Sequence, residues 1–188
     1  MAFDSLLFRK VLGQFATGIT IVTTTLPSGE PWAMTANSFT SISLDPPIVM
    51  VAVSHGLTTN EAIRRSGAFA VNILRADQIE LSRRYSRRER PPDQFADLEL
   101  RREVTGAPII EGSLGWVDCR LTDLTEQGDH TVFFGTVQAI DLSDRLDDPL
   151  LYYNSTYVRI QPASSDTEDQ DDAPTAKLLL VNSDSATS

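Results

Sequence analysis

The first apolar positions of the chain follow a helical spacing. They fall at i, i+3, i+4 and i+7, so they share one face of an α-helix. Asp4 or Ser5 stands where an N-cap is expected, and Gly18 is expected to end the helix. The apolar face consists of Phe8, Val11, Leu12 and Phe15.

Most of the remaining chain shows β-branched and apolar runs separated by turn residues, a pattern typical of strands. Two short helices interrupt it. The first is expected at 58–65 with Thr58 or Thr59 as its cap, and the second at 78–85 after Asp77. The predicted strands are 19–25, 32–41, 48–53, 69–74, 114–124, 131–142 and 152–160.

The order of these elements indicates a mainly β fold. Short turns join neighbouring strands, which favours antiparallel pairing, and residues 126–129 form the loop of a long hairpin. Several runs are apolar on both sides. Closure of the sheet would explain this, because a barrel hides its strand edges. We therefore predict a β-barrel with a few short helices.

Charge is distributed unevenly along the 188 residues. The formal net charge of −10 argues against nucleic acid as a partner, because phosphates need a basic surface. Residues 161–188 contain six acidic residues, one lysine and no aromatic residue. We therefore expect one domain over residues 1–160 and an acidic disordered tail over 161–188.

Cysteine content and hydropathy bear on location. Cys119 is the only cysteine, so an internal disulfide is impossible, which fits a reducing cytoplasm. No secretion signal is recognised, and every apolar run is shorter than the roughly 20 residues of a membrane helix. These features predict a cytoplasmic protein with no membrane association.

Several chemistries lack their sequence motifs. The chain contains no Gly-x-Gly, hence no dinucleotide fingerprint of the doubly wound kind, and no phosphate loop ending in Gly-Lys-Ser/Thr. The only histidines are His55 and His130, and no metal-ligand spacing is present. We therefore expect no metal site.

One candidate binding stretch lies at a predicted strand end. Small and hydroxyl-bearing residues there allow close backbone approach and directed hydrogen bonds, as a flat polar ring requires. An edge strand with a solvated Thr and Ser face is the alternative interpretation. The residues are Met34, Thr35, Ala36, Asn37 and Ser38.

A second stretch opens the first short internal helix. Helix N-termini attract phosphate through unpaired N–H groups and a positive partial charge. Simple N-capping would explain one threonine but not the whole cluster. The candidate residues are Ser54, His55, Thr58 and Thr59.

Two further features have alternative interpretations. His130 directly follows a turn, where it either faces a cleft and contacts a ligand or remains exposed and hydrogen-bonds Asp129. A cluster of arginines is either a solvated face or a site for a nucleotide phosphate. This cluster comprises Arg83, Arg84, Arg87, Arg88 and Arg90.

Taken in order, six stretches resemble the flavin reductase family, the small reductase partners of two-component flavin monooxygenases. Each stretch is weak alone, but six in family order are specific, and the resemblance covers about residues 8–160. The stretches are 15–23, 35–41, 43–47, 66–74, 128–130 and 150–153.

The resemblance implies a split β-barrel of the FMN-binding type, assembled as a homodimer with FMN or FAD at the subunit interface. It implies an NAD(P)H:flavin oxidoreductase that transfers a hydride from NADH, or NADPH, to flavin. The reduced flavin would pass transiently to a partner monooxygenase. The domain over 1–160 would then be a flavin reductase-like split barrel.

Site roles are carried over from the same resemblance. The strand end matching 35–38 lies along the isoalloxazine in such proteins, and the segment matching 54–59 holds the flavin phosphate. His130 corresponds to a histidine near the nicotinamide site, so we expect it to be the catalytic residue. Many relatives have a basic residue where this chain has His55-Gly56-Leu57, which leaves the choice between FMN and FAD open.

Two other functional classes remain open from the sequence. A flavoprotein on the same fold could retain its flavin and act as an oxidase, oxygenase or electron carrier. A non-enzymatic interaction domain could instead use the barrel surface and the acidic tail.

Overall fold

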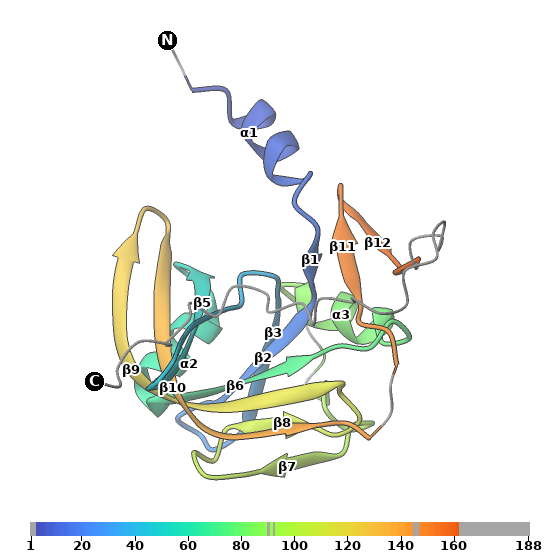
Figure 1. Cartoon of the computed structure of the whole chain (residues 1–188). Helices are drawn as coiled ribbons and strands as arrows, with labels where there is room; N and C mark the ends of the chain where they lie inside the picture. The colour runs from blue at the N-terminus through green and yellow to red at the C-terminus, as the bar shows by residue number, and fades with distance from the viewer. Residues whose placement is uncertain (1–2, 90, 92, 145–146, 162–188) are drawn as a thin grey trace, which may run out of the picture.

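The architecture comes from a computed structural model, which describes residues 3–89, 91, 93–144 and 147–161 (Figure 1). Arg90 and most of the predicted acidic tail lie outside the described residues. Three helices are described: α1 (Ser5–Leu12), α2 (Thr58–Ser66) and α3 (Ile79–Ser86). The strands are β1 (Thr17–Gly18), β2 (Thr20–Thr25), β3 (Pro31–Ala36), β4 (Thr40–Leu44), β5 (Pro47–Ser54), β6 (Ala68–Ile73), β7 (Leu100–Arg102), β8 (Pro108–Ile110), β9 (Gly115–Gln127), β10 (His130–Leu142), β11 (Leu151–Tyr153) and β12 (Thr156–Val158).

A seven-stranded antiparallel sheet forms the body of the protein, which confirms the mainly β fold. Its order is β3-β2-β6-β9-β10-β5-β4. The long β9–β10 hairpin turns at Gly128, whose φ of 60° is in the left-handed region that glycine tolerates best. Two small sheets, β1-β11-β12 and β7-β8, accompany this large one.

The sheet curls around one apolar core without closing through a strand ladder. Val22 of β2 and Met34 of β3, near one edge of the sheet, pack in a single cluster with residues from strands further along it. These are Phe69 of β6, Phe133 of β10 and Val51 of β5. Among the described strands, no pairing joins β3 to β4. The predicted closed barrel is therefore an open, curled sheet with an opening between its two edge strands.

A second apolar cluster explains why several strands are apolar on both sides. Along β2, Val22 contributes to the inner core and Ile21 to the other cluster, as the period of two in a strand requires. Leu81 and Tyr85 of α3 and Ile110 of β8 cover that second face. Packing against added elements, rather than barrel closure, accounts for the pattern.

Several boundaries differ from the expectation. α1 begins at its Asp4 cap but ends at Gly13, before the predicted Gly18. The predicted strand 32–41 is split between β3 and β4, and 152–160 falls across the β11–β12 hairpin. The strands β7 and β8 were not predicted, since each has only three residues and too little pattern to detect.

Candidate functional site

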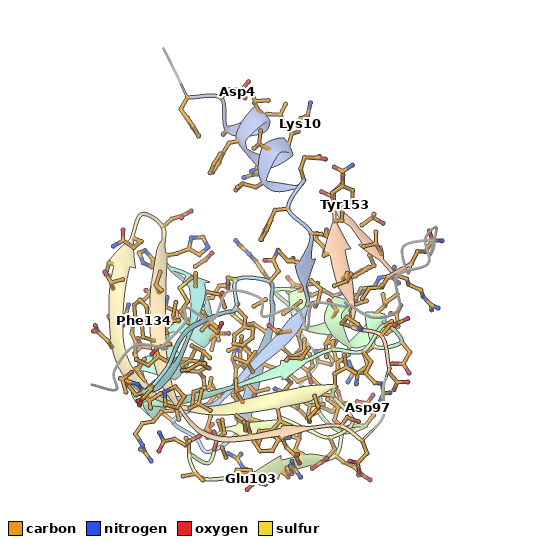
Figure 2. All side chains as sticks on the ribbon, viewed as in Figure 1. Asp4, Lys10, Asp97, Glu103, Phe134 and Tyr153 are labelled. Atoms are coloured by element: carbon orange, nitrogen blue, oxygen red, sulfur yellow. The ribbon has the colours of Figure 1, made fainter. Side chains whose placement is uncertain are left out.

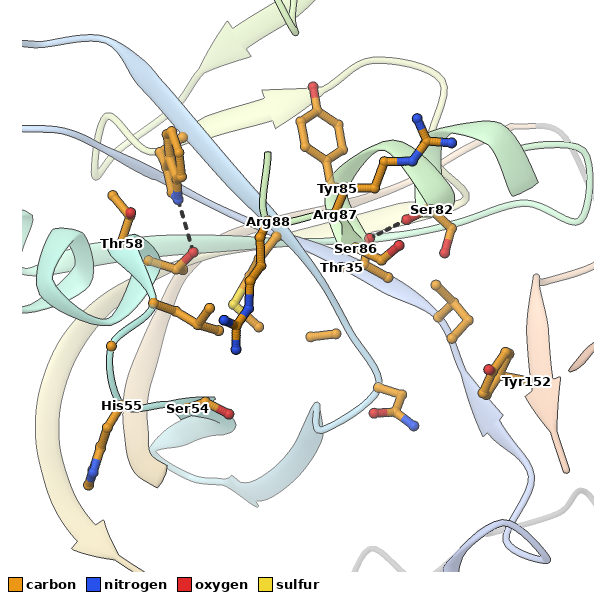
Figure 3. Close-up of a pocket in the computed structure, with 18 of the residues that line it drawn as sticks. Thr35, Ser54, His55, Thr58, Ser82, Tyr85, Ser86, Arg87, Arg88 and Tyr152 are labelled. Atoms are coloured by element: carbon orange, nitrogen blue, oxygen red, sulfur yellow. Dashed lines mark hydrogen bonds between the residues drawn. The ribbon is translucent and has the colours of Figure 1, made fainter. Parts of the chain in front are cut away.

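A cavity of about 790 Å³ opens where the end of β3 meets the start of α2 (Figure 3). Ligand pockets commonly measure about 300–1,000 Å³. Eight of the predicted cofactor-binding residues line it: Met34, Thr35, Ala36, Asn37, Ser54, His55, Thr58 and Thr59. Segments 34–37 and 54–59, which lie apart in the sequence, thus form a single site.

The strand end is held rigidly from both sides. Thr35 Oγ1 donates a hydrogen bond to the Ser82 carbonyl on α3 at 2.6 Å. The Ala36 carbonyl accepts from Thr20 Oγ1 at 2.9 Å. Asn37 Nδ2 donates to Thr17 Oγ1 at 3.3 Å. This wall of the cavity is therefore fixed by neighbouring elements before any ligand arrives.

Ser38 has a different position from its predicted partners. It is not among the residues that line the cavity. Its hydroxyl donates to the Ala52 carbonyl at 2.9 Å and accepts from the Ala52 N–H at 3.1 Å. This pair of bonds, the Ser38 clasp, links the segment just after β3 to β5.

The start of α2 forms the opposite wall. The chain leaves β5 at Ser54, turns at Gly56 with a φ of 75°, and enters the helix at Thr58. Thr58 and Thr59 lie inside the helix, so the predicted threonine cap is wrong; Leu57 occupies the cap position without a side-chain bond. A helix start without a side-chain cap can place its N–H groups against an anion.

His130 is not among the residues that line the cavity, but it contacts the cavity wall through Ser54. The two residues face each other across β10 and β5, and His130 Nε2 lies 2.8 Å from Ser54 Oγ. His130 Nδ1 lies 2.7 Å from Asp129 Oδ1, and the histidine lowers the pKa of that carboxyl. The expected turn contact with Asp129 and a contact to the cavity wall therefore occur together.

His55 lies at the edge of the cavity, where a charged cluster holds its ring. Its Nε2 lies 2.7 Å from Glu126 Oε2, and Glu126 also accepts hydrogen bonds from Arg64 and from Thr131. The bond from Arg64, then that from Thr131, lowers the pKa of Glu126 to about 2. Figure 3 shows His55 projecting away from Thr58 and Arg88.

Several lining residues escaped the sequence analysis. Trp32 belongs to the same strand face as Met34 and Ala36, so the period of two could have identified it. Ser82, Tyr85 and Ser86 share one face of α3 at i, i+3 and i+4, but nothing in the sequence places α3 beside β3. Ile19, Tyr152 and Tyr157 come from distant segments. Arg87 and Arg88 also line the cavity, and both belong to the arginine cluster that the sequence offered as either a solvated face or a phosphate site.

The described residues provide neither a metal site nor a membrane-spanning helix. No group of His, Cys, Asp or Glu in the described part of the chain is arranged to hold a metal ion. Among the helices of that part, none has the length and apolar character needed to span a bilayer.

Comparison with known proteins gives a consistent set of relatives. The family model described as "Flavin reductase like domain" matches residues 12–161. The reductase subunit HsaB of a flavin-dependent monooxygenase from Mycobacterium tuberculosis is 37% identical over 182 residues, covering 96% of each chain. An NADH-dependent FAD reductase from Streptomyces globisporus is 40% identical over 137 residues, covering 71% of this chain and 74% of the relative.

A solved structure extends the likeness to three dimensions. The crystal structure of a nitrilotriacetate monooxygenase component B homologue from Mycobacterium thermoresistibile is 41% identical. It superposes with a TM-score of 0.80, covering 91% of this chain and 94% of the other. The likeness therefore includes nearly all of both chains.

Proposed function

The chain belongs to the flavin reductase like family, and we propose that it transfers a hydride from NADH or NADPH to FMN or FAD and supplies the reduced flavin to a partner monooxygenase. One observation carries this proposal: the cavity brings together a strand end suited to a flat ring and a helix start suited to a phosphate. Relatives named as reductase subunits and as an NADH-dependent reductase support it.

The residues of the cavity fit a flavin. Ala36 is small and buried, which leaves room for an aromatic ring beside the β3 backbone. Hydroxyl groups of Ser54, Thr58 and Thr59 surround the start of α2, where a phosphate is favoured. We therefore assign cofactor binding to residues 34–37 and to this segment, with Ser38 supporting the strand end through its clasp.

A bound flavin accepts the hydride, and the protein supplies binding and alignment. Met34 and the β3 backbone form one face of the ring site, and α3 fixes their position through Thr35. We assign His130 to the nicotinamide side, where Asp129 orients its ring. No side chain is required to act as a nucleophile.

We propose a homodimer, because the surface of α1 is otherwise unexplained. Figure 2 shows this helix projecting away from the body with its side chains spread into solvent. Leu7 is 57% exposed and Val11 is 59% exposed. Apolar patches of this kind mark interaction sites on soluble proteins. The other exposed members are Phe3, Leu6, Phe8, Leu12 and Phe15.

Sedimentation velocity tests the homodimer. We expect a dimer for the full chain and a monomer for Leu7→Asp/Val11→Asp, whereas Lys10→Asp on the same helix leaves the dimer intact. A monomeric wild-type protein at micromolar concentration would refute the assembly.

Three narrower assignments accompany the function. We propose that the reductase domain spans residues 1–160, consistent with the family match over 12–161, and that the acidic remainder is a tail. We also propose a cytoplasmic location, since the lone Cys119 is buried and unpaired. The link to the monooxygenase is the transient transfer of reduced flavin.

Absorbance at 340 nm tests the function directly, by following NADH oxidation with and without added FMN or FAD. Oxidation that requires free flavin and saturates with it supports the reductase. Oxidation without added flavin indicates a tightly held prosthetic group, the main alternative. Flavin binding without oxidation of either NADH or NADPH would overturn the proposal.

A further inference from the structure

A buried hydroxyl group lies behind the start of α2. Thr131 of β10 is fully buried and is not among the residues that line the cavity. Its Oγ1 accepts hydrogen bonds from Asn60 Nδ2 at 3.0 Å and from Arg64 Nη2 at 2.7 Å, and it donates to Glu126 Oε2 at 2.9 Å. A hydroxyl has one hydrogen to donate and two lone pairs to accept with, so this one is fully used. We call Thr131 and these three partners the Thr131 hub.

Asn60 connects the hub to the end of β5. Its side chain is buried, and its Oδ1 accepts from Arg64 Nε at 2.8 Å. This contact fixes the amide, so that Nδ2 faces Thr131 and also donates to the Val53 carbonyl at 3.1 Å. Since Asn60 itself lies in the first turn of α2, one side chain joins the end of β5 to the beginning of the helix.

Glu126 connects the hub to the segment between β5 and α2. It accepts hydrogen bonds from both Arg64 and Thr131, and its Oε2 lies 2.7 Å from His55 Nε2. The main chain of His55 is held as well, because its N–H donates to the Asp129 carbonyl at 2.9 Å. The charge of Arg64 is balanced by Glu126. The hub therefore acts on a nearby ligand through geometry rather than through net charge.

The segment held by these contacts is the one assigned to the flavin phosphate. A helix start binds an anion when its free N–H groups converge on it, and a binding constellation must be held to within about 0.5 Å. The cap residue of α2, Leu57, makes no side-chain hydrogen bond that would fix the first turn. The hub provides this support from the side of the helix start that faces away from the cavity.

We propose that Thr131 and Asn60 are positioning residues of the phosphate site, which hold the start of α2 so that its N–H groups meet the phosphate of the flavin. The inference rests on the proposed function and deepens it, because it assigns the preference for a phosphorylated flavin to residues that do not line the cavity. Binding of FMN should depend on the hub, and binding of riboflavin should not.

Equilibrium binding of riboflavin and FMN tests this role, because the two ligands differ by the phosphate alone. Quenching of flavin fluorescence gives both dissociation constants without catalysis. Thr131→Val keeps a β-branched side chain of similar shape in β10 but removes the hydroxyl. We expect the dissociation constant of FMN to rise about tenfold, or about 1.4 kcal/mol, and that of riboflavin to change by less than about twofold.

Two controls separate positioning from a general loss of stability. Thr131→Ser retains the hydroxyl, so we expect FMN binding within about twofold of the wild type. Thr23→Val makes the same chemical change on β2, where Thr23 is fully buried, accepts from Asn72 Nδ2 at 3.2 Å and does not line the cavity. We expect Thr23→Val to lower the free energy of unfolding, as Thr131→Val does, but to leave the ratio of the two dissociation constants unchanged.

Arg64→Lys provides a second test at a position that reaches solvent, since the Arg64 side chain is 31% exposed. Lysine keeps the positive charge but replaces the planar fork of donors with a single ammonium group. It therefore cannot reproduce the contacts to both Asn60 and Glu126. We expect FMN to bind about threefold more weakly and riboflavin to stay within about twofold of the wild type.

The outcomes bear on different assignments. Equal weakening of riboflavin and FMN by Thr131→Val, or the same change of their ratio in Thr23→Val, overturns the positioning role, because the hub would then only stabilise the fold. Arg64→Lys with wild-type FMN binding also overturns it, and this variant decides the matter if Thr131→Val does not fold. A wild-type protein that binds riboflavin and FMN equally well overturns the phosphate assignment, whereas one that binds no flavin overturns the proposed function.

Discussion

The Ser38 clasp joins the fold to the site, and removing it is the most informative perturbation of the strand end. Ser38 follows the end of β3, and its hydroxyl makes two bonds with the Ala52 backbone on β5. These bonds continue the β4–β5 pairing, in which Thr40 faces Met50, by one further step toward β3. The mutation Ser38→Ala therefore releases residues 34–37 from the strand that leads into segment 54–59.

The magnitude follows from these two hydrogen bonds. Each net hydrogen bond contributes about 0.5–1.5 kcal/mol, so the loss of both predicts about 1–3 kcal/mol of destabilisation. Ala52 is half-buried, so water can reach its freed groups in part, which places the expected value near the lower end. Because the strand end becomes looser, we also expect weaker flavin binding.

Urea unfolding at pH 7 and flavin titration measure the two effects on the same samples. Ser41→Ala on the exposed β4 is the matched control and should change the free energy of unfolding by less than about 0.5 kcal/mol. Equal stabilities of Ser38→Ala and Ser41→Ala would refute the clasp. Weaker flavin binding with unchanged stability would show that Ser38 contacts the flavin directly.

Four further predictions concern single residues. Gly135→Ala places its Cβ 2.7 Å from a core phenyl ring, so we expect a loss of about 1–3 kcal/mol in urea unfolding; Gly18→Ala meets nothing within 4 Å and should not destabilise. Burial raises the pKa of Cys119 to about 12, so a thiolate-specific reagent at pH 8 should label it only after unfolding, and labelling of the native protein would contradict its burial. The pKa of Glu126 is lowered from its ordinary value of 4.5 to about 2, so its contribution to stability is complete above about pH 4.5 and is lost as pH falls toward 2. Glu126→Gln should therefore reduce stability at pH 7 and have little effect near pH 2, and equal losses at both pH values would argue against the ionic contacts. His130→Ala should raise the KM for NADH far more than the dissociation constant for flavin, and an unchanged KM would remove this residue from the nicotinamide site.

Local sequence patterns were sufficient to predict where most helices and strands lie. Runs of β-branched residues located β2, β5, β6 and the β9–β10 hairpin to within a few residues, because backbone preference and alternating burial are local properties. The interruption after β3 was missed, since residues 37–39 contain neither glycine nor proline to mark a break in the strand. The short strands β7 and β8 depend on packing against the sheet, so no local signal marks them.

The sequence by itself also indicated the candidate segments for ligand binding. Residues 34–37 and 54–59 were identified from side-chain chemistry and family order, and the structure brings them to one cavity. The roles of individual members depended on their neighbours in space. His55 has the right chemistry for a phosphate, but its ring already has a hydrogen-bond partner in Glu126, 71 positions away.

Only the tertiary structure decided which groups have partners. Ser38 and Asn37 are adjacent in the chain, yet one hydroxyl bridges to β5 while the neighbouring amide lines the cavity. The arginine cluster looked uniform in sequence, but Arg84 is paired with Asp97 and Arg88 lines the cavity. Backbone preference and apolar periodicity act over a few residues, so the sequence determines elements and their faces. Hydrogen bonds and ion pairs join residues tens of positions apart, so they are fixed only when the sheet has curled and α3 has packed against it.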